Sequence, residues 1–225
     1  MNITVLEGKT LLINKPLQWT SFDVVNKVRY LIKKSLNEKR IKVGHAGTLD
    51  PLATGLLILC TGKLTKRIGE YQGLEKEYIG KLTLGATTPS YDLETPIDKT
   101  FNIDYITEAM IRQTAKKFIG TISQIPPAFS ARKINGERAY KKARRGEKII
   151  MKPTEVVITQ FDITKISLPV IEFRVVCDKG TYIRSLVRDF GEALNNGAYL
   201  AALCRTRIGK YKLEEALEIE DLRFN

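Results

Sequence analysis

The sequence predicts an α+β protein with a central, mostly antiparallel mixed sheet flanked by helices. Two observations support this class. Short apolar or alternating segments typical of strands occur along the whole chain, together with amphipathic helical stripes, and the two kinds do not alternate strictly as they would in a parallel βαβ sheet. The length of 225 residues and a composition with 43% hydrophobic residues suit a single folded domain spanning residues 1–225.

The first third of the chain predicts two strands, a helix and a loop. The apolar run Leu11–Pro16 ends at a proline and indicates a short buried strand. Apolar residues at helical spacing predict a helix that Ser21 caps and that continues to about Ser35. Turn-forming residues from Gly44 to Gly55 indicate a loop, and Leu56–Cys60 indicates a second strand.

Further along, the same criteria predict four strands and two helices. The strands are Glu77–Leu84, a short segment ending at Ile125, Glu155–Ile163 and Val170–Cys177, the last two joined by a turn at Leu168-Pro169. The helices are Asp104–Phe118 and one capped by Thr181, whose apolar stripe comprises Ile183, Leu186, Val187, Phe190 and Leu194.

Basic residues exceed acidic ones, with 37 Lys and Arg against 25 Asp and Glu and a net charge of +12. This excess indicates a polyanion partner, with a merely solvated cationic surface as the alternative. Residues 132–152 hold nine Lys or Arg and two acids. We interpret the segment of about residues 128–152 as a mobile arm that docks on phosphates, although a solvated helix face is also possible. The candidate phosphate-binding residues are Arg132, Lys133, Lys141, Lys142, Arg144 and Arg145.

Several function classes are disfavoured by what the sequence contains. His45 is the single histidine, so catalytic triads and multi-histidine metal sites lack support. Gly8-Lys9-Thr10 mimics the end of a P-loop without its first glycine, and neither a dinucleotide fingerprint nor a Cys-x-x-Cys pair occurs. We therefore expect no metal and no cofactor.

The expected location is the cytoplasm. Cys60 and Cys177 lie in apolar runs, which indicates buried, reduced thiols. The N-terminus lacks the pattern of a signal peptide, and no apolar run reaches the length of a membrane helix.

The stretch with the strongest chemical signal surrounds Asp50-Pro51. Taken alone, this pair indicates a helix start, with Asp as the cap and Pro in the first turn. Gly44, Gly47 and Gly55 surround it and indicate a backbone that approaches something closely. The two interpretations are compatible, because a helix start favours an ionised carboxylate, as a nucleophile requires.

Between Gly44 and Gly55 the sequence reads His-Ala-Gly-Thr-Leu-Asp-Pro-Leu-Ala-Thr. This run, with its two flanking glycines, resembles the signature loop of the TruB family of tRNA pseudouridine synthases. Further segments similar to that family follow in order along nearly the whole chain. They are Asn14-Lys15-Pro16, Thr61-Gly62-Lys63-Leu64-Thr65-Lys66, Lys76-Glu77-Tyr78, Asp92, Pro126-Pro127-Ala128-Phe129-Ser130-Ala131, Lys179-Gly180-Thr181-Tyr182-Ile183-Arg184 and Leu203-Cys204-Arg205.

The resemblance implies the pseudouridine synthase catalytic fold and a cofactor-free isomerisation of uridine 55 in the TΨC loop of tRNA. It implies that Asp50 is the essential aspartate, acting covalently or otherwise on the sugar. It implies that Tyr78 stacks on the base and helps to remove its C5 proton, and that Arg184 pairs with the aspartate. It further implies substrate-binding or supporting roles for His45, Tyr182, Leu203, Lys15, Lys66 and Asp92.

The same resemblance identifies residues 128–152 with the family's thumb loop and implies that the target base is flipped out of its RNA loop. Many relatives continue into a C-terminal PUA domain, which we do not expect here. The expected partner is the T-arm of tRNA, with no membrane or protein partner, and the expected state is a monomer. The alternatives are a pseudouridine synthase with other RNA targets and a non-catalytic tRNA-binding or folding chaperone.

Overall fold

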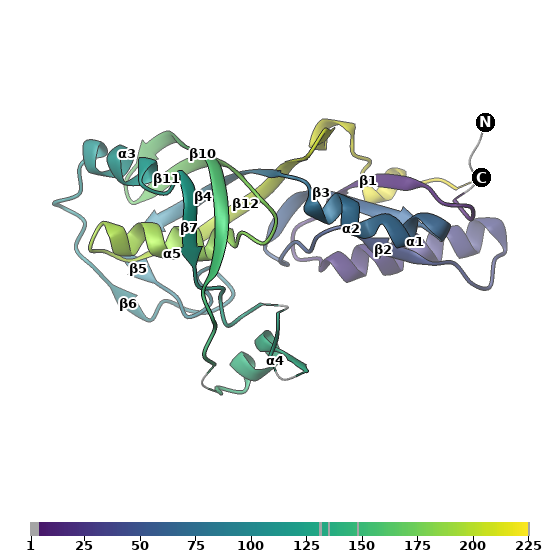
Figure 1. The fold of residues 1–225 in the computed structure, drawn as a ribbon, viewed down its shortest axis with the longest axis horizontal. Coiled ribbons are helices and arrows are strands. Elements are labelled where there is room, and N and C mark those ends of the chain that lie inside the picture. The colour runs from purple at the N-terminus through teal and green to yellow at the C-terminus, as the bar shows by residue number, and fades with distance from the viewer. Residues whose placement is uncertain (1–4, 131, 135, 148, 225) are drawn as a thin grey trace. The chain divides into compact units, whose positions relative to one another are not determined.

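The computed structural model describes residues 5–130, 132–134, 136–147 and 149–224, without the side chains of residues 133 and 134. The chain divides into two compact units (Figure 1). Unit 1 comprises residues 1–79 and 203–225, and unit 2 comprises residues 80–202. The divisions fall within two strands, β4 (Lys76–Leu84) and β12 (Ala198–Ile208).

Unit 1 contains strands in the order β1-β3-β12-β4, with β2 beside β3 and β13 beside β12. The bounds are Thr10–Lys15 for β1, Val43–His45 for β2, Ala53–Thr61 for β3 and Tyr211–Lys212 for β13. β3 pairs antiparallel with β1 and β2 and parallel with β12. The helical elements are α1 (Ser21–Leu36), α2 (Ile68–Gly73), η1 (Gly62–Arg67), η2 (Leu213–Glu215) and η3 (Ile219–Asp221).

Helix α1 begins at a capping box. The side chain of Thr20 accepts from the backbone N–H of Asp23, and the Asp23 carboxylate accepts from the backbone N–H of Thr20. Asn37 ends the helix in the left-handed conformation, with φ 53°, and its N–H donates to Lys33 O. An N-terminal cap of this kind stabilises a helix by about 1 kcal/mol. The predicted cap, Ser21, is wrong by one residue, because its hydroxyl bonds elsewhere.

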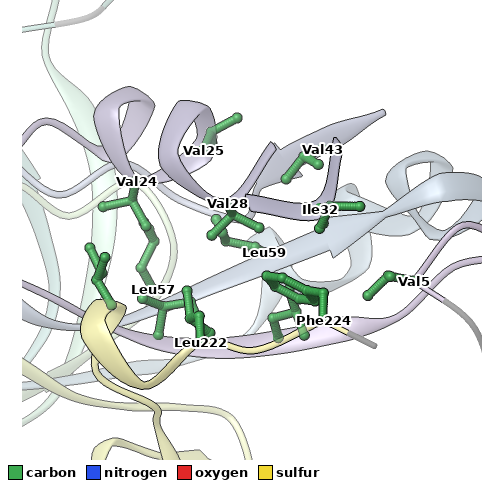
Figure 2. Close-up of a cluster of buried hydrophobic side chains, with 13 residues drawn as sticks. Val5, Val24, Val25, Val28, Ile32, Val43, Leu57, Leu59, Leu222 and Phe224 are labelled. Atoms are coloured by element: carbon green, nitrogen blue, oxygen red, sulfur yellow. The ribbon is translucent and has the colours of Figure 1, made fainter. Parts of the chain in front are cut away.

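The largest core of unit 1 lies between α1, β1 and β3. Val24, Val28 and Ile32, on one face of α1, are wholly buried, as the helical spacing predicts. Figure 2 shows these side chains facing Leu57 and Leu59 of β3, with Leu222 and Phe224 from the end of the chain beside them. The core of unit 1 is therefore assembled from both ends of the sequence.

Unit 2 contains strands in the order β12-β4-β11-β10-β7, with β10 antiparallel to both β11 and β7. The bounds are Gly120–Gln124 for β7, Thr154–Ser167 for β10 and Val170–Cys177 for β11. Two short hairpins are β5 (Ala86–Thr87) with β6 (Lys99–Thr100) and β8 (Lys133–Ile134) with β9 (Glu137–Arg138). The helices are α3 (Glu108–Lys116), α4 (Ala139–Arg144) and α5 (Ile183–Ala193).

The core of unit 2 is aromatic. Phe161 and Phe173 of β10 and β11 meet edge to face with ring centroids 5.7 Å apart, and Phe161 also contacts Phe190 of α5 at 5.8 Å. Phe118, just after α3, contacts Phe161 and Phe190. These contacts place α3 and α5 against the strands, with aromatic pairs in the favoured tilted and edge geometries.

The structure confirms the α+β class and the mixed, mostly antiparallel strand pairing. Besides the cap of α1, two local predictions are wrong and one strand was missed. Thr181 does not cap α5, whose N-cap is Tyr182, and its hydroxyl instead donates to Asp178 O. Asp50 does not start a helix, because residues 51 and 52 form a turn that leads into β3. Strand β12 was not predicted, although it carries Leu203.

Candidate active site

The loop that carries Asp50 lies between β2 and β3 and is tied by backbone hydrogen bonds. The Ala53 N–H donates to Asp50 O at 3.0 Å, and the Gln18 N–H donates to Pro51 O at 2.8 Å. The buried Ser21 hydroxyl accepts from the Leu49 N–H at 2.9 Å. Ser21 therefore joins the start of α1 to this loop, which explains why it does not cap the helix.

Lys15, at the end of β1, is a buried cation under the same loop. Its side chain is wholly buried. Nζ donates to Pro16 O at 2.8 Å, to Trp19 O at 2.6 Å and to Pro51 O at 3.4 Å. The last bond reaches the residue next to Asp50, so Lys15 holds the loop from inside the protein.

Arg205 of β12 is a second buried cation in contact with the loop. Its side chain is 1% exposed. Nε donates to Leu56 O at 2.8 Å and Nη2 donates to Gly47 O at 3.1 Å. Arg205 thus joins both sides of the Asp50 loop, and the sequence analysis had not assigned it this role.

The charges around Asp50 explain how an ionised carboxylate is favoured without a helix start. Burial lowers the pKa of Lys15 to about 8, and the Asp50 carboxylate opposes this fall by attraction. The same attraction favours the charged form of the carboxylate. Arg205 adds a cation that lowers the pKa of Lys15 further. Buried cations therefore replace the helix dipole that the sequence had suggested.

Gly55, at the end of this loop, lies very close to another segment of the backbone. Its φ is +102°, and a Cβ added to it would lie 2.4 Å from Arg205 O and 2.7 Å from Arg205 N. Gly55 pairs in parallel with Arg205 across β3 and β12. The close approach at Gly55 is therefore to the chain's own backbone, and a side chain here would separate β3 from β12.

Three other predicted site residues lie on strands of unit 1. Tyr78 of β4 is 8% exposed. His45 ends β2 opposite Leu59. Leu203 of β12 is half-buried and pairs with Ala53, three residues after Asp50. Strand pairing therefore brings Leu203 to the end of the Asp50 loop.

Arg184 and Asp92 of unit 2 form a buried ion pair. Both side chains are nearly inaccessible, and Nε of Arg184 lies 3.6 Å from Oδ2 of Asp92. Nη1 of Arg184 donates to Ser90 O at 3.2 Å and Nη2 donates to Phe129 O at 2.8 Å. The Asp92 carboxylate also accepts from the Glu94 N–H at 2.9 Å. This gives Asp92 a definite part in orienting Arg184.

Tyr182 sits at the N-cap of α5, two residues before Arg184. It is half-buried, and its N–H donates to Oε1 of Gln124, at the end of β7, at 2.8 Å. Gln124 was not among the site residues predicted from the sequence. No sequence signal other than its place beside Pro126-Pro127-Ala128-Phe129-Ser130 could have indicated it.

The basic segment forms the connection between β7 and β10 (Figure 1). Two of its arginines, Arg144 and Arg145, are exposed and paired with acids. Arg144 bonds Glu94 at 2.5 Å, and Arg145 bonds Glu137 and Glu147, each at 2.7 Å. These hydrogen bonds raise the pKa of both guanidinium groups. The segment's positive charge is therefore partly neutralised within the protein.

The other predicted RNA-binding residues differ in their contacts. Arg132 donates to Thr154 Oγ1 at 2.9 Å, and Lys142 lies 4.0 Å from Glu147. Lys141 is exposed on α4. The side chain of Lys133 lies outside the described residues.

Lys66 lies on η1 of unit 1. It lines a hollow of about 470 Å³ together with other residues of η1, Leu6 and residues of the loop between α1 and β2. Four of the lining side chains are cationic and one is acidic: Arg40, Lys42, Lys63, Lys66 and Glu38.

Cys60 and Cys177 are buried, as their apolar surroundings predicted. Burial raises the pKa of Cys60 to about 11, so this thiol stays protonated. Within the described ranges, no group of three or more His, Cys, Asp or Glu side chains is arranged to hold a metal ion. In the same part of the chain, no helix is long and apolar enough to cross a membrane.

The chain is similar to known proteins in family, sequence and structure. The model of the TruB family pseudouridylate synthase N-terminal domain matches residues 33–183. Proteins named tRNA pseudouridine synthase B from Phocaeicola vulgatus and Flavobacterium johnsoniae are each 56% identical to the chain. Each alignment covers 95% of this chain, with 91% and 94% of the respective relative.

Among solved structures, a chain of a Cbf5-Nop10-Gar1 complex matches with a TM-score of 0.73 and 29% identity. The match covers 98% of this chain and 54% of that one, so the present chain spans about half of its length. A chain of an H/ACA RNP bound to a substrate RNA matches with a TM-score of 0.69 and 27% identity. The chain described here therefore belongs to the TruB family of pseudouridylate synthases.

Proposed function

We propose that the protein isomerises uridine 55 in the TΨC loop of tRNA to pseudouridine, without a cofactor. The relatives' names support tRNA as the substrate. The observation that carries the mechanism is the Asp50 loop, which buried Lys15 and Arg205 hold from inside the protein. A carboxylate kept charged and fixed in place is what attack on a sugar carbon requires.

The reaction exchanges one glycosidic bond for another within a single nucleotide. The bond from ribose C1′ to N1 of uracil breaks while Asp50 meets the electron-deficient sugar, by a covalent bond or by charge alone. The base then turns, C1′ bonds to C5, the C5 proton leaves and N1 is protonated. In this scheme Tyr78 stacks on the base and takes part in removing the C5 proton, directly or through water.

Arg184 would orient the aspartate by pairing with it. Its side chain is already held by Asp92 and by two backbone carbonyls, so its guanidinium is preorganised. Fixed groups that need no reorganisation at the moment of reaction contribute most to such electrostatic stabilisation.

A stacked uracil cannot reach these groups, so the target nucleotide must leave its RNA loop. Flipping costs a few kcal/mol, and less in a loop than in a duplex. Tyr182, Leu203 and His45 would receive the base, and the basic segment would close on the T-arm phosphates. We expect the enzyme to act as a monomer in the cytoplasm.

Tritium release from a T-arm stem-loop carrying 5-tritiated uridine tests this function. The wild-type protein should release tritium from the target position, and Asp50→Asn should bind the RNA equally well while releasing none above background. Turnover by Asp50→Asn would remove Asp50 from its role. A wild-type protein that binds but releases nothing would favour the chaperone alternative.

Substrate breadth needs a separate arm of the same assay. The structural likeness to a chain of an H/ACA RNP bound to a substrate RNA makes other RNA targets the second candidate. A stem-loop with the target uridine moved by one position, and an unrelated tritiated stem-loop, should both release at least about 100-fold less tritium if the enzyme is specific for the T-loop.

A further inference from the structure

Gln124, the last residue of β7, supplies a hydrogen-bond acceptor to the start of α5. Its side chain is 1% exposed, and Oε1 accepts from the Tyr182 N–H at 2.8 Å. The first N–H groups of a helix have no partner within the helix. Since Tyr182 makes no side-chain cap, the strand beside it provides one of the missing acceptors.

Two further bonds join the same segment to the first turn of α5. The Ser185 hydroxyl donates to Ile125 O at 2.8 Å, and Arg184 donates to Phe129 O at 2.8 Å. Gln124 is therefore one of three successive anchors. It is the one that fixes the backbone of Tyr182.

The amide nitrogen of the Gln124 carboxamide has an unusual environment. Nε2 is buried and has no hydrogen-bond partner among the described residues. The orientation of the carboxamide follows from its bond to the Tyr182 N–H, because only the carboxamide oxygen can accept a hydrogen bond. Buried unsatisfied donors are rare and costly in native proteins. A side chain that anchors Tyr182 with an acceptor alone would avoid this cost. The donor that Gln124 retains therefore indicates a partner that binds later.

We propose that Gln124 recognises the substrate: Nε2 donates to a carbonyl oxygen of the flipped uracil, while Oε1 holds Tyr182 in place. This inference rests on the proposed function, in which Tyr182 lines the base pocket. Because Oε1 bonds the Tyr182 amide, Nε2 lies beside the same residue. A buried donor can meet only a group that is itself removed from water, as a flipped base is.

The chemical consequence is selectivity for a base with a carbonyl at that position. A site with a buried donor rejects an analogue that cannot accept, because the donor is then left unpaired. If that carbonyl is the one at C4, the amino group that replaces it in cytosine would face the Gln124 donor with a second donor.

Three variants assayed by tritium release separate recognition from anchoring. Gln124→Glu keeps an acceptor for the Tyr182 N–H but replaces the donor with an oxygen that repels a carbonyl. We expect kcat/KM at pH 8 to fall on the order of 100-fold. Gln124→Met, neutral and of similar size, removes both functions and should fall at least as far. Ser185→Ala removes a neighbouring anchor without touching the donor and should stay within about threefold of wild type.

The pH profile of Gln124→Glu provides the readout that anchoring alone would not move. Burial raises the pKa of the introduced carboxyl, and the neutral acid can again donate. The ratio of variant to wild-type kcat/KM should therefore rise as the pH falls. A constant ratio, or losses in all three variants that merely follow their unfolding temperatures, would overturn the proposal.

The same assay distinguishes this inference from the proposed function. If the wild type releases no tritium, the function itself is wrong. If the wild type is active, Asp50→Asn is inactive and Gln124→Glu retains full kcat/KM, only the role of Gln124 is wrong.

Discussion

The chain uses cations in two contrasting ways. Lys15 and Arg205 are buried within unit 1 and donate to backbone carbonyls around the Asp50 loop. Arg144 and Arg145, in the basic segment, are exposed and paired with glutamates. Buried charges act on the protein's own geometry and are little affected by salt, whereas exposed charges are screened and remain available to a ligand. Burial, rather than residue type, thus separates cations that shape the protein's own loop from cations that we propose bind RNA.

The largest effect expected from this contrast is on stability. Arg205→Met leaves the carbonyls of Leu56 and Gly47 without their donor inside the protein and should lower the free energy of unfolding by about 2–4 kcal/mol. Arg223→Met is the matched control, because Arg223 also donates to two carbonyls but is exposed. Urea unfolding followed by circular dichroism measures both. Equal losses in the two variants would contradict the distinction by burial.

The second effect is a pH dependence set by Lys15. Because folding lowers the pKa of Lys15 from 10.5 to about 8, its ammonium is lost above about pH 8. Burying the charged form costs free energy below that pH, and this cost disappears between pH 8 and 10.5. Activity should move the opposite way, because Asp50 loses its neighbouring cation: kcat/KM should decline above about pH 8.

Lys15→Met tests the source of this decline. The variant should be slower than wild type at pH 7 and should lack the decline near pH 8, as measured by tritium release at several pH values. A decline of the same size and position in Lys15→Met would assign it to another group.

The third effect concerns RNA affinity. Replacing Arg144 and Arg145 together by Ala should weaken T-arm binding about tenfold near physiological salt, with a smaller dependence on salt because fewer phosphates are neutralised. Arg112→Ala, which removes an exposed ion pair on α3, serves as the control. Fluorescence anisotropy at several salt concentrations measures both. An unchanged salt slope in the double variant would mean that the basic segment does not contact phosphate.

The smallest expected effect concerns the acidic residues of the basic segment. Glu137 pairs with Arg145 through two hydrogen bonds, and phosphate must displace it. Glu137→Gln should therefore tighten T-arm binding by about two- to threefold and leave the unfolding midpoint unchanged, because exposed pairs contribute little to stability. Weaker binding in the same anisotropy titration would show that the pair instead orders Arg145 for the RNA.

Periodicity predicted most elements but not the details at their ends. The apolar stripe of α1 and the strand Val170–Cys177 follow directly from spacing. Strand β12 was missed because Ala198–Ile208 mixes small, apolar and basic residues, and its pairing between β3 and β4 is non-local. Thr20 and Ser21 are both good caps, and only the Ser21–Leu49 contact decides between them.

The Asp50 loop could be located from sequence, but its support could not. The family resemblance implied a supporting role for Lys15, but not its burial or its bonds to backbone carbonyls, and Arg205 lies more than 150 positions from Asp50 along the chain. Asp92 and Arg184 are likewise joined only by tertiary contact. Local spacing carries no information on such pairs. The roles of the individual site residues in turnover remain predictions for the experiments above.

The two units differ in when synthesis makes their residues available. Unit 2 is one continuous stretch, so all of it has been synthesised before residues 203–225. The core of unit 1 also needs Leu222 and Phe224, which are synthesised later than any residue of unit 2. Since domains fold as units during synthesis, the Asp50 loop can reach its final support only after unit 2 has been synthesised.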